Sequence, residues 1–152
     1  MNPSIQDREF ATSRALSASP AEVLAAIADP QRLARWWGPN GFTNTIHEFD
    51  FQPGGTWIHD MHGPDGSVYP NRSVFVETGP QRIVIEHLET VHHFILTLTL
   101  EPAANGTLLT WRQTFDSVEE CDLVRPYVPR CNEENLDRLE AELKLLTHPT
   151  NP

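Results

Sequence analysis

Residues 36–66 read WWGPNGFTNTIHEFDFQPGGTWIHDMHGPDG. Glycine, proline, asparagine and aspartate, which favour tight turns, gather there in three clusters at 38–41, 53–55 and 63–66. Between the clusters, residues 42–51 and 56–62 have the length and the β-branched and aromatic content of strands. The segment therefore predicts the end of a helix followed by two antiparallel strands, because so short a connection leaves no room for a crossover.

The strand pattern continues downstream with four more predicted strands. They span residues 68–77, 81–87, 92–101 and 107–115. Asn105-Gly106, a strong hairpin signal, connects the last two strands, and the other connections are also of hairpin length. Six strands therefore follow one another as an antiparallel meander. In residues 8–16 apolar and polar side chains alternate, although not strictly, which predicts a seventh strand.

Helix start signals precede and follow this meander. Ser19, Pro20 and Glu22 form a capping box with proline at the first helical position, and Asp29-Pro30 repeats the signal before a second short helix at 31–37. Asn132 is expected to cap a final helix at 133–146. The leucines of this final helix recur with helical spacing and form one apolar face: Leu136, Leu139, Leu143 and Leu146.

These elements predict an α+β fold in which a seven-stranded antiparallel sheet wraps around a long C-terminal helix. Two short helices follow the first strand. A sheet with one apolar face needs a cover, and the leucine face of the last helix provides it. A curved sheet around one helix leaves a cavity between them. We expect one stand-alone domain over residues 1–152, with its core at about 8–146 and a flexible tail at 147–152.

The charge of the chain argues against several classes of partner. The formal net charge is −10, and the 11 lysines and arginines are scattered, whereas nucleic acids and anionic membranes require clustered cations. The first residues lack the pattern of a signal peptide, and no apolar run approaches the ~20 residues of a membrane span. Cys121 and Cys131 match no zinc motif and are interpreted as free thiols, which favours a cytoplasmic location.

Strand periodicity assigns side chains to the inner face of the predicted sheet. By this rule four histidines face inward, namely His47, His59, His87 and His92. Strand 68–77 stays ambiguous, because its valines and its aromatic residues point to opposite faces. Polar groups at one edge of an aromatic interior are typical of a small-molecule site.

The candidate ligand-binding residues are mainly strand residues assigned to the inner face. Residues at or after the end of the second helix and one leucine of the final helix are added to them. Many of the aromatic ones are equally suited to a packed core. For the histidines the alternatives are pocket lining, core packing and a metal site, and no metal-binding motif is present. We expect neither a metal nor a cofactor. The candidates are Trp37, Phe42, His47, Phe49, Trp57, His59, Met61, Tyr69, Phe75, Ile85, His87, His92, Phe94, Leu96, Trp111, Gln113 and Leu139.

No catalytic signature accompanies these residues. The sequence contains no G-x-S-x-G elbow, no Walker loop and no G-x-G-x-x-G. Asp65 precedes Gly66 in a turn, and Asp60 has outward parity. Catalysis therefore rests only on the inward histidines as an acid or base, and the catalytic residues stay unassigned.

The chain resembles the START-like (SRPBCC) superfamily and, within it, the family of activator of Hsp90 ATPase homologues. The resemblance rests on SPAEVLAAIADPQRLARWWGPNGF, DFQPGGTWIHDMHGPDGSVYPN, FVETGPQRIVIEH, TLLTWRQTF and NLDRLEAEL, over about residues 8–146. It implies a helix-grip fold with a hydrophobic cavity. The segment 128–131 departs from the family pattern, and we expect it to shape the helix side or the entrance of the cavity.

Three functions remain open after this resemblance. The first is binding of a small hydrophobic or aromatic molecule between the sheet and the last helix. The second is an enzyme of the cyclase or lyase type that uses cavity histidines. The third is a protein-interaction or chaperone co-factor role, for which the acidic surface suits a basic partner. A homodimer also remains open.

Overall fold

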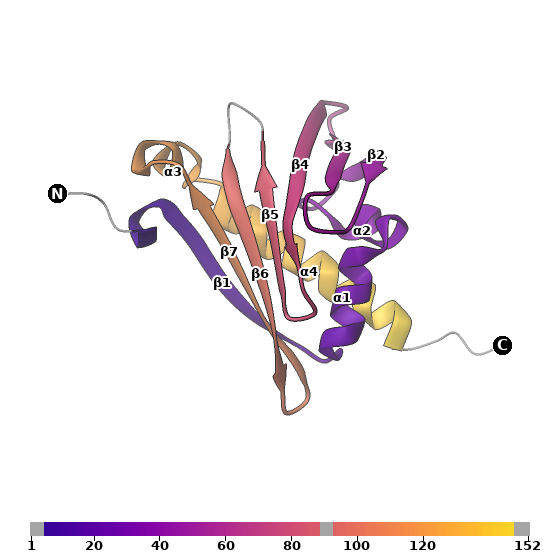
Figure 1. Cartoon of the computed structure of the whole chain (residues 1–152). Coiled ribbons are helices and arrows are strands. Elements are labelled where there is room, and N and C mark those ends of the chain that lie inside the picture. Colours follow the sequence, from indigo (N-terminus) through magenta and orange to yellow (C-terminus); the bar gives the residue numbers. More distant parts are fainter. Residues whose placement is uncertain (1–4, 89–92, 148–152) are drawn as a thin grey trace.

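The computed structural model describes residues 5–88 and 93–147, with side chains from Asp7 to Leu145 apart from that gap. The predicted tail beyond residue 147 and the side chain of Leu146 lie outside the described part. Figure 1 shows a sheet that crosses in front of a long C-terminal helix. The elements are η1 Ile5–Arg8, β1 Glu9–Leu16, α1 Pro20–Ala28, α2 Pro30–Trp36, β2 Thr43–Phe49, β3 Thr56–His62, β4 Val68–Thr78, β5 Arg82–His87, β6 Phe94–Ala103, β7 Gly106–Phe115, α3 Val118–Val124 and α4 Val128–Thr147.

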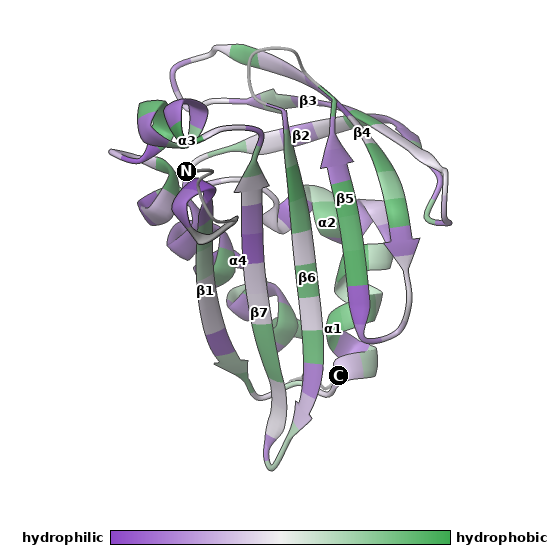
Figure 2. Ribbon diagram, turned by 60° about the vertical axis from the view of Figure 1, so that its left-hand side comes forward, coloured by the Kyte–Doolittle hydropathy of each residue, from purple (hydrophilic) through white to green (hydrophobic). Residues whose placement is uncertain are grey.

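The sheet has seven strands in the order β1-β7-β6-β5-β4-β3-β2, and every neighbouring pair is antiparallel. The meander predicted from the turn clusters is therefore confirmed, and the N-terminal strand pairs with the last one. β1 and β2 form the two edges, so the sheet is open. Figure 2 shows strands β6 and β7 of this sheet passing in front of α4.

The core lies between the sheet and α4, as the leucine spacing predicts. Leu136, Leu139 and Leu143 of α4 are buried and pack with strand residues such as Leu98 and Leu109. Removal of these apolar side chains from water is the main stabilising contribution to such a fold. α1 and α2 pack against the same helix, and the predicted capping box of Ser19 and Glu22 is present.

The start of α4 differs from the prediction. Asn132 is not a cap, because the helix begins four residues earlier at Val128. Pro129 therefore stands in the first turn, where its missing N–H group would have no helical partner in any case. The amide of Cys131 donates to the carbonyl of Tyr127 at 3.1 Å, which closes that first turn. Asn132 is consequently placed one turn inside the helix.

The facing of His47 also differs from the prediction. The pairing of β2 with β3 shifts between Ile46 and Glu48, which makes His47 the extra residue of a β-bulge. A bulge resets the alternation of side chains, so strict period two fails across it. His47 is exposed and its Nε2 lies 2.9 Å from Oδ2 of Asp60.

The ambiguity in β4 is resolved by its register. Ser73 and Phe75 are buried, whereas Val76 is exposed. A second bulge, between Phe75 and Glu77, places Val76 outside the regular ladder with β5. The inner face of β4 therefore carries Tyr69, Asn71, Ser73 and Phe75.

Candidate functional site

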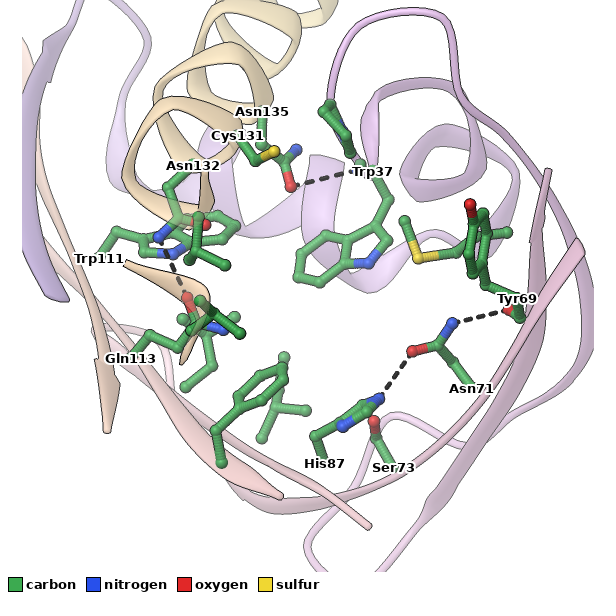
Figure 3. A pocket seen from close by; sticks show the side chains of 18 of the residues that line it. Trp37, Tyr69, Asn71, Ser73, His87, Trp111, Gln113, Cys131, Asn132 and Asn135 are labelled. Atoms are coloured by element: carbon green, nitrogen blue, oxygen red, sulfur yellow. Dashed lines mark hydrogen bonds between the residues drawn. The ribbon is translucent and has the colours of Figure 1, made fainter. Parts of the chain in front are cut away.

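A pocket of about 300 Å3 lies between the inner face of the sheet, the N-terminal half of α4 and the segment after α2. Figure 3 shows its walls from close by, with the side chain of Trp37 extending into it. Strands β3 to β7 form one wall and residues 124–135 form the other. The lining residues are Trp37, Gly38, Pro39, Trp57, His59, Met61, Tyr69, Asn71, Ser73, Ile85, His87, Phe94, Leu96, Trp111, Gln113, Phe115, Val124, Tyr127, Val128, Cys131, Asn132 and Asn135.

The segment that carries Trp37 is held in place by α4. The Nδ2 group of Asn135 donates to the carbonyl of Trp36 at 2.9 Å, and its Oδ1 accepts from the amide of Gly38 at 3.1 Å. Arg138 donates to five carbonyl groups in and after α2. These bonds satisfy carbonyl groups at the end of α2 that have no helical partner. We call residues 37–42 the Trp37 loop.

Gly38 has a specific role in this loop. Its φ angle is +98°, a region that residues with a side chain rarely adopt. A Cβ atom at this position would lie 2.8 Å from Cε of Met61. Met61 could move its terminal methyl group aside, so the positive φ angle is the main reason that glycine is favoured at residue 38.

Tryptophan rings form the centre of the apolar wall. The ring of Trp37 lies 5.0 Å from that of Trp57 in an edge contact and 5.6 Å from that of Trp111 in a stacked one. Such aromatic pairs add to the stabilisation that burial alone provides. Within the described chain, the indole nitrogens of Trp57 and Trp111 are buried without a hydrogen-bond partner.

His59 is the most unusual polar residue of the pocket. Its side chain is 2% exposed, and its ring stacks on Trp57 with 4.4 Å between centroids. Among the described residues neither ring nitrogen has a hydrogen-bond partner. Burial, reinforced by the nearby His87, lowers the pKa of His59 to about 4. The imidazole is therefore neutral at pH 7 and presents one donor and one acceptor.

Two amide-containing pairs add to the polar lining. The Nε2 of His87 lies 2.7 Å from Oδ1 of Asn71, which only accepts, so His87 is the donor. The Nδ2 of Asn132 donates to Oε1 of Gln113 at 3.0 Å, across the gap between α4 and β7. No Lys, Arg, Asp or Glu is among the described residues that line the pocket. The pocket therefore offers hydrogen bonds but no full charge.

Eleven of the seventeen candidate residues come together in this pocket. Parity along the strands was the signal that located most of them. They are Trp37, Trp57, His59, Met61, Tyr69, Ile85, His87, Phe94, Leu96, Trp111 and Gln113.

Five other candidates lie elsewhere, and His92 lies outside the described residues. Phe49, Phe75 and Leu139 do not line the pocket, because they pack within the core. Phe42 lies at the end of the Trp37 loop and contacts Tyr69 with 5.9 Å between ring centroids, beside the pocket. His47 faces solvent because of the bulge in β2.

Sequence reasoning missed the polar residues of the helix side. Asn132 was expected to cap the helix, and Asn135 was not assigned to the cavity side of it, whereas both line the pocket on a helix that begins at Val128. The prediction that segment 128–131 shapes the cavity is confirmed for Val128 and Cys131. Burial raises the pKa of the Cys131 thiol, so this group is not an activated nucleophile.

In the residues that the structure describes, no three His, Cys, Asp or Glu side chains are grouped so that they could hold a metal ion. None of the described helices is long and apolar enough to span a membrane.

An open antiparallel sheet that curves around a long C-terminal helix, with a pocket between them, defines the START-like, helix-grip class of proteins. The chain belongs to the AHSA1 family, described as activator of Hsp90 ATPase homolog 1-like proteins, whose model matches residues 17–144. No curated protein matches this chain.

Solved structures share the fold over nearly the whole chain. A protein from Arthrobacter aurescens is 24% identical with a TM-score of 0.85, covering 99% of this chain and 92% of that one. A protein from Nitrosomonas europaea is 20% identical with a TM-score of 0.84, covering 95% and 99%. A protein from Chromobacterium violaceum is 27% identical with a TM-score of 0.76, covering 88% and 95%.

Proposed function

We propose that this protein binds a small, predominantly apolar or aromatic molecule in the pocket between the sheet and α4. The family and fold support a ligand-binding or co-chaperone-type domain. The pocket favours the first alternative, because apolar walls with a few placed polar groups are typical of small-molecule sites. We also propose that the chain acts as a single domain and that it is located in the cytoplasm.

The observation that carries the proposal is the combination of an apolar pocket and buried nitrogens without a partner in its wall. A pocket of about 300 Å3 is lined by three tryptophans, and the buried His59 has two ring nitrogens without a partner in the described chain. Buried polar groups are normally paired, and an unpaired one costs free energy. A ligand that fills the volume and pairs such groups gains affinity from both effects.

A neutral fluorescent probe, N-phenyl-1-naphthylamine, tests this proposal. We expect it to bind with an increase in fluorescence, and members of a panel of aromatic and apolar metabolites to displace it and raise the melting temperature. The variant Cys131→Trp fills the helix side of the pocket and is expected to abolish binding.

The matched control is Arg130→Trp, the same new side chain one position earlier. Arg130 has a side chain that is 77% exposed and does not line the pocket, so this variant should bind the probe like the original protein. Probe binding that survives Cys131→Trp, together with no stabilisation by any compound of the panel, would show that the pocket is not a binding site.

A further inference from the structure

The polar groups of the pocket fall into two sets on opposite walls. Figure 3 shows Gln113 and Asn132 together on one side and Ser73 with His87 and Asn71 on the other. The first set joins β7 to α4, and the second joins β4 to β5. Between them the sheet contributes apolar side chains to the pocket, including Phe94 and Leu96.

The strand register gives the separation of the two sets. Ser73 pairs with His87 and His87 pairs with Phe94, while Leu96 of the same strand pairs with Gln113. Ser73 and Gln113 are therefore three strand spacings apart, on β4 and β7. Three spacings of about 4.8 Å and the step of about 6.6 Å from Phe94 to Leu96 along β6 together correspond to roughly 16 Å on a flat sheet, and the curvature brings the side chains closer.

The set on β7 and α4 retains unused hydrogen-bonding capacity. The bond between Gln113 and Asn132 uses Oε1 of the first and Nδ2 of the second. Within the described chain this leaves the Nε2 donors of Gln113 and the Oδ1 acceptor of Asn132 for a ligand. A hydroxyl group can satisfy both, because it accepts and donates at once.

The set on β4 and β5 offers a hydroxyl of its own. Ser73 is buried and lines the pocket, and its Oγ makes no hydrogen bond among the described residues. A serine hydroxyl both donates and accepts. Beside it, the contact with Asn71 fixes the ring of His87, so this wall is preorganised.

We infer that the ligand is an uncharged, elongated ring compound with a hydroxyl or carbonyl oxygen at each end, one bound by Gln113 and Asn132 and the other by Ser73. This inference rests on the proposed function and adds the ligand class. Charged groups are excluded because the described lining supplies no counter-charge, and a buried unpaired ion is strongly destabilising. The apolar residues between the sets hold the ring body.

Four neutral biphenyls test the inference by calorimetric titration of the whole protein. They are biphenyl, 4-hydroxybiphenyl, 4,4′-dihydroxybiphenyl and 3,4-dihydroxybiphenyl, and biphenyl-4-carboxylate is the charged comparison. We expect each hydroxyl at a separate end to improve affinity about tenfold, the value of one well-made hydrogen bond. The 3,4-isomer, with both oxygens at one end, should bind no better than 4-hydroxybiphenyl, and the carboxylate should bind at least tenfold more weakly.

Variants assign each end of the ligand. Ser73→Ala should weaken binding of 4,4′-dihydroxybiphenyl about tenfold and leave biphenyl within twofold. The double variant Gln113→Leu/Asn132→Leu should do the same at the other end. Removing both partners leaves no unpaired amide, so this variant is preferred over Gln113→Leu alone for stability.

The outcomes separate this inference from the proposed function. Biphenyl and 4,4′-dihydroxybiphenyl binding equally well would overturn the two-ended ligand class while leaving an apolar binding site intact. Binding of the carboxylate as tightly as 4-hydroxybiphenyl would overturn the requirement for an uncharged ligand. Failure of all five compounds and of N-phenyl-1-naphthylamine to bind would overturn both proposals.

Discussion

The guanidinium group of Arg138 donates a hydrogen bond of 2.9 Å to the carbonyl oxygen of Phe42, 96 residues earlier in the chain. The same group also reaches the carbonyls of Trp37, Gly38 and Pro39 at 2.9–3.1 Å. Burial lowers the pKa of Arg138 below its ordinary value, although an arginine remains charged at neutral pH. Together with Asn135 and Glu134, this side chain fixes the Trp37 loop to α4.

Replacing Arg138 with lysine should therefore destabilise the protein. Lysine keeps the charge but offers three donors without the planar fork of arginine, so several loop carbonyls lose their partner. We expect a loss of about 2 kcal/mol in the free energy of unfolding and a melting temperature lower by roughly 6 °C. Denaturant unfolding measures the first value, and Arg130→Lys, at an exposed position of the same helix, should change neither.

Because the pKa of His59 is lowered, we expect the free energy of unfolding to fall below neutral pH. Its pKa is about 4 in the folded protein and about 6.5 in the unfolded chain, so the unfolded chain binds the extra proton first. The contribution of neutral His59 is complete above pH ~6.5 and falls as the pH drops to about 4, by about 3 kcal/mol in total. Urea unfolding between these pH values measures the slope.

His59→Phe is the matched variant for this effect. Phenylalanine retains a ring to stack on Trp57 and has no nitrogen to titrate. The pH dependence between about 4 and 6.5 should become flatter by the contribution of His59. An unchanged slope in His59→Phe would mean that other groups cause the acid sensitivity.

His93 predicts the opposite pH dependence. Its Nδ1 lies 2.7 Å from Asp116 and its Nε2 lies 2.8 Å from Glu86, so both nitrogens face carboxylates. The bond to Glu86 and then that to Asp116 raise the pKa of His93. Its stabilisation is complete below the unfolded pKa of about 6.5 and is lost as the pH rises through the folded pKa.

A titration of the His93 ring followed by NMR checks this directly and should give a midpoint above 6.5. The variant His93→Gln should be less stable than the original protein at about pH 6, and the difference should shrink at higher pH. A difference that grows with pH would contradict the assignment.

Substitution of Glu142, which does not line the pocket, is expected to destabilise the protein. Its carboxylate is 4% exposed and accepts from Arg35 at 2.7 Å and from Arg32 at 3.3 Å. The bond to Arg35 is the main reason that the pKa of Glu142 is lowered, so its stabilisation is lost as the pH falls through the folded pKa. Glu142→Gln should cost about 3 kcal/mol, because it leaves the partly buried Arg32 without a counter-charge.

Asp122→Asn provides the comparison for Glu142→Gln in the same denaturant experiment. Asp122 of α3 and Arg125, the residue directly after this helix, form a pair in which both side chains are at least half exposed. Exposed pairs contribute little, so a change below about 0.5 kcal/mol is expected. Equal costs for the two variants would show that burial does not determine the strength of these ion pairs.

The sheet could be predicted from the sequence because the residues that determine its strands and turns lie next to one another in the chain. The turn residues at 53–55, 63–66 and 105–106 set both the ends and the antiparallel direction of the strands they connect. The capping box at Ser19 was equally readable, since all its atoms lie within four residues.

The misplaced residues have a common physical cause. The bulge at His47 adds one residue to β2 without any glycine or proline signal, and one added residue reverses the facing assigned by parity. The position of Asn132 depended on whether Pro129 ends or begins a helix, and proline is suited to either boundary. Register and helix start are decided by packing with distant segments, which no local pattern contains.

The attachment of the Trp37 loop to α4 also sets an order of events during synthesis. Arg138 and Gly38 are 100 residues apart, and Asn135 and Gly38 are 97 apart. A ribosome therefore delivers the tryptophans and the first hairpin long before the residues that hold them. Contacts of such long sequence separation form late in folding. The Trp37 loop can therefore reach its final position only after α4 has been made, and a chain truncated before Asn135 would lack Asn135 and Arg138 together with the buried leucines of α4 that complete the core.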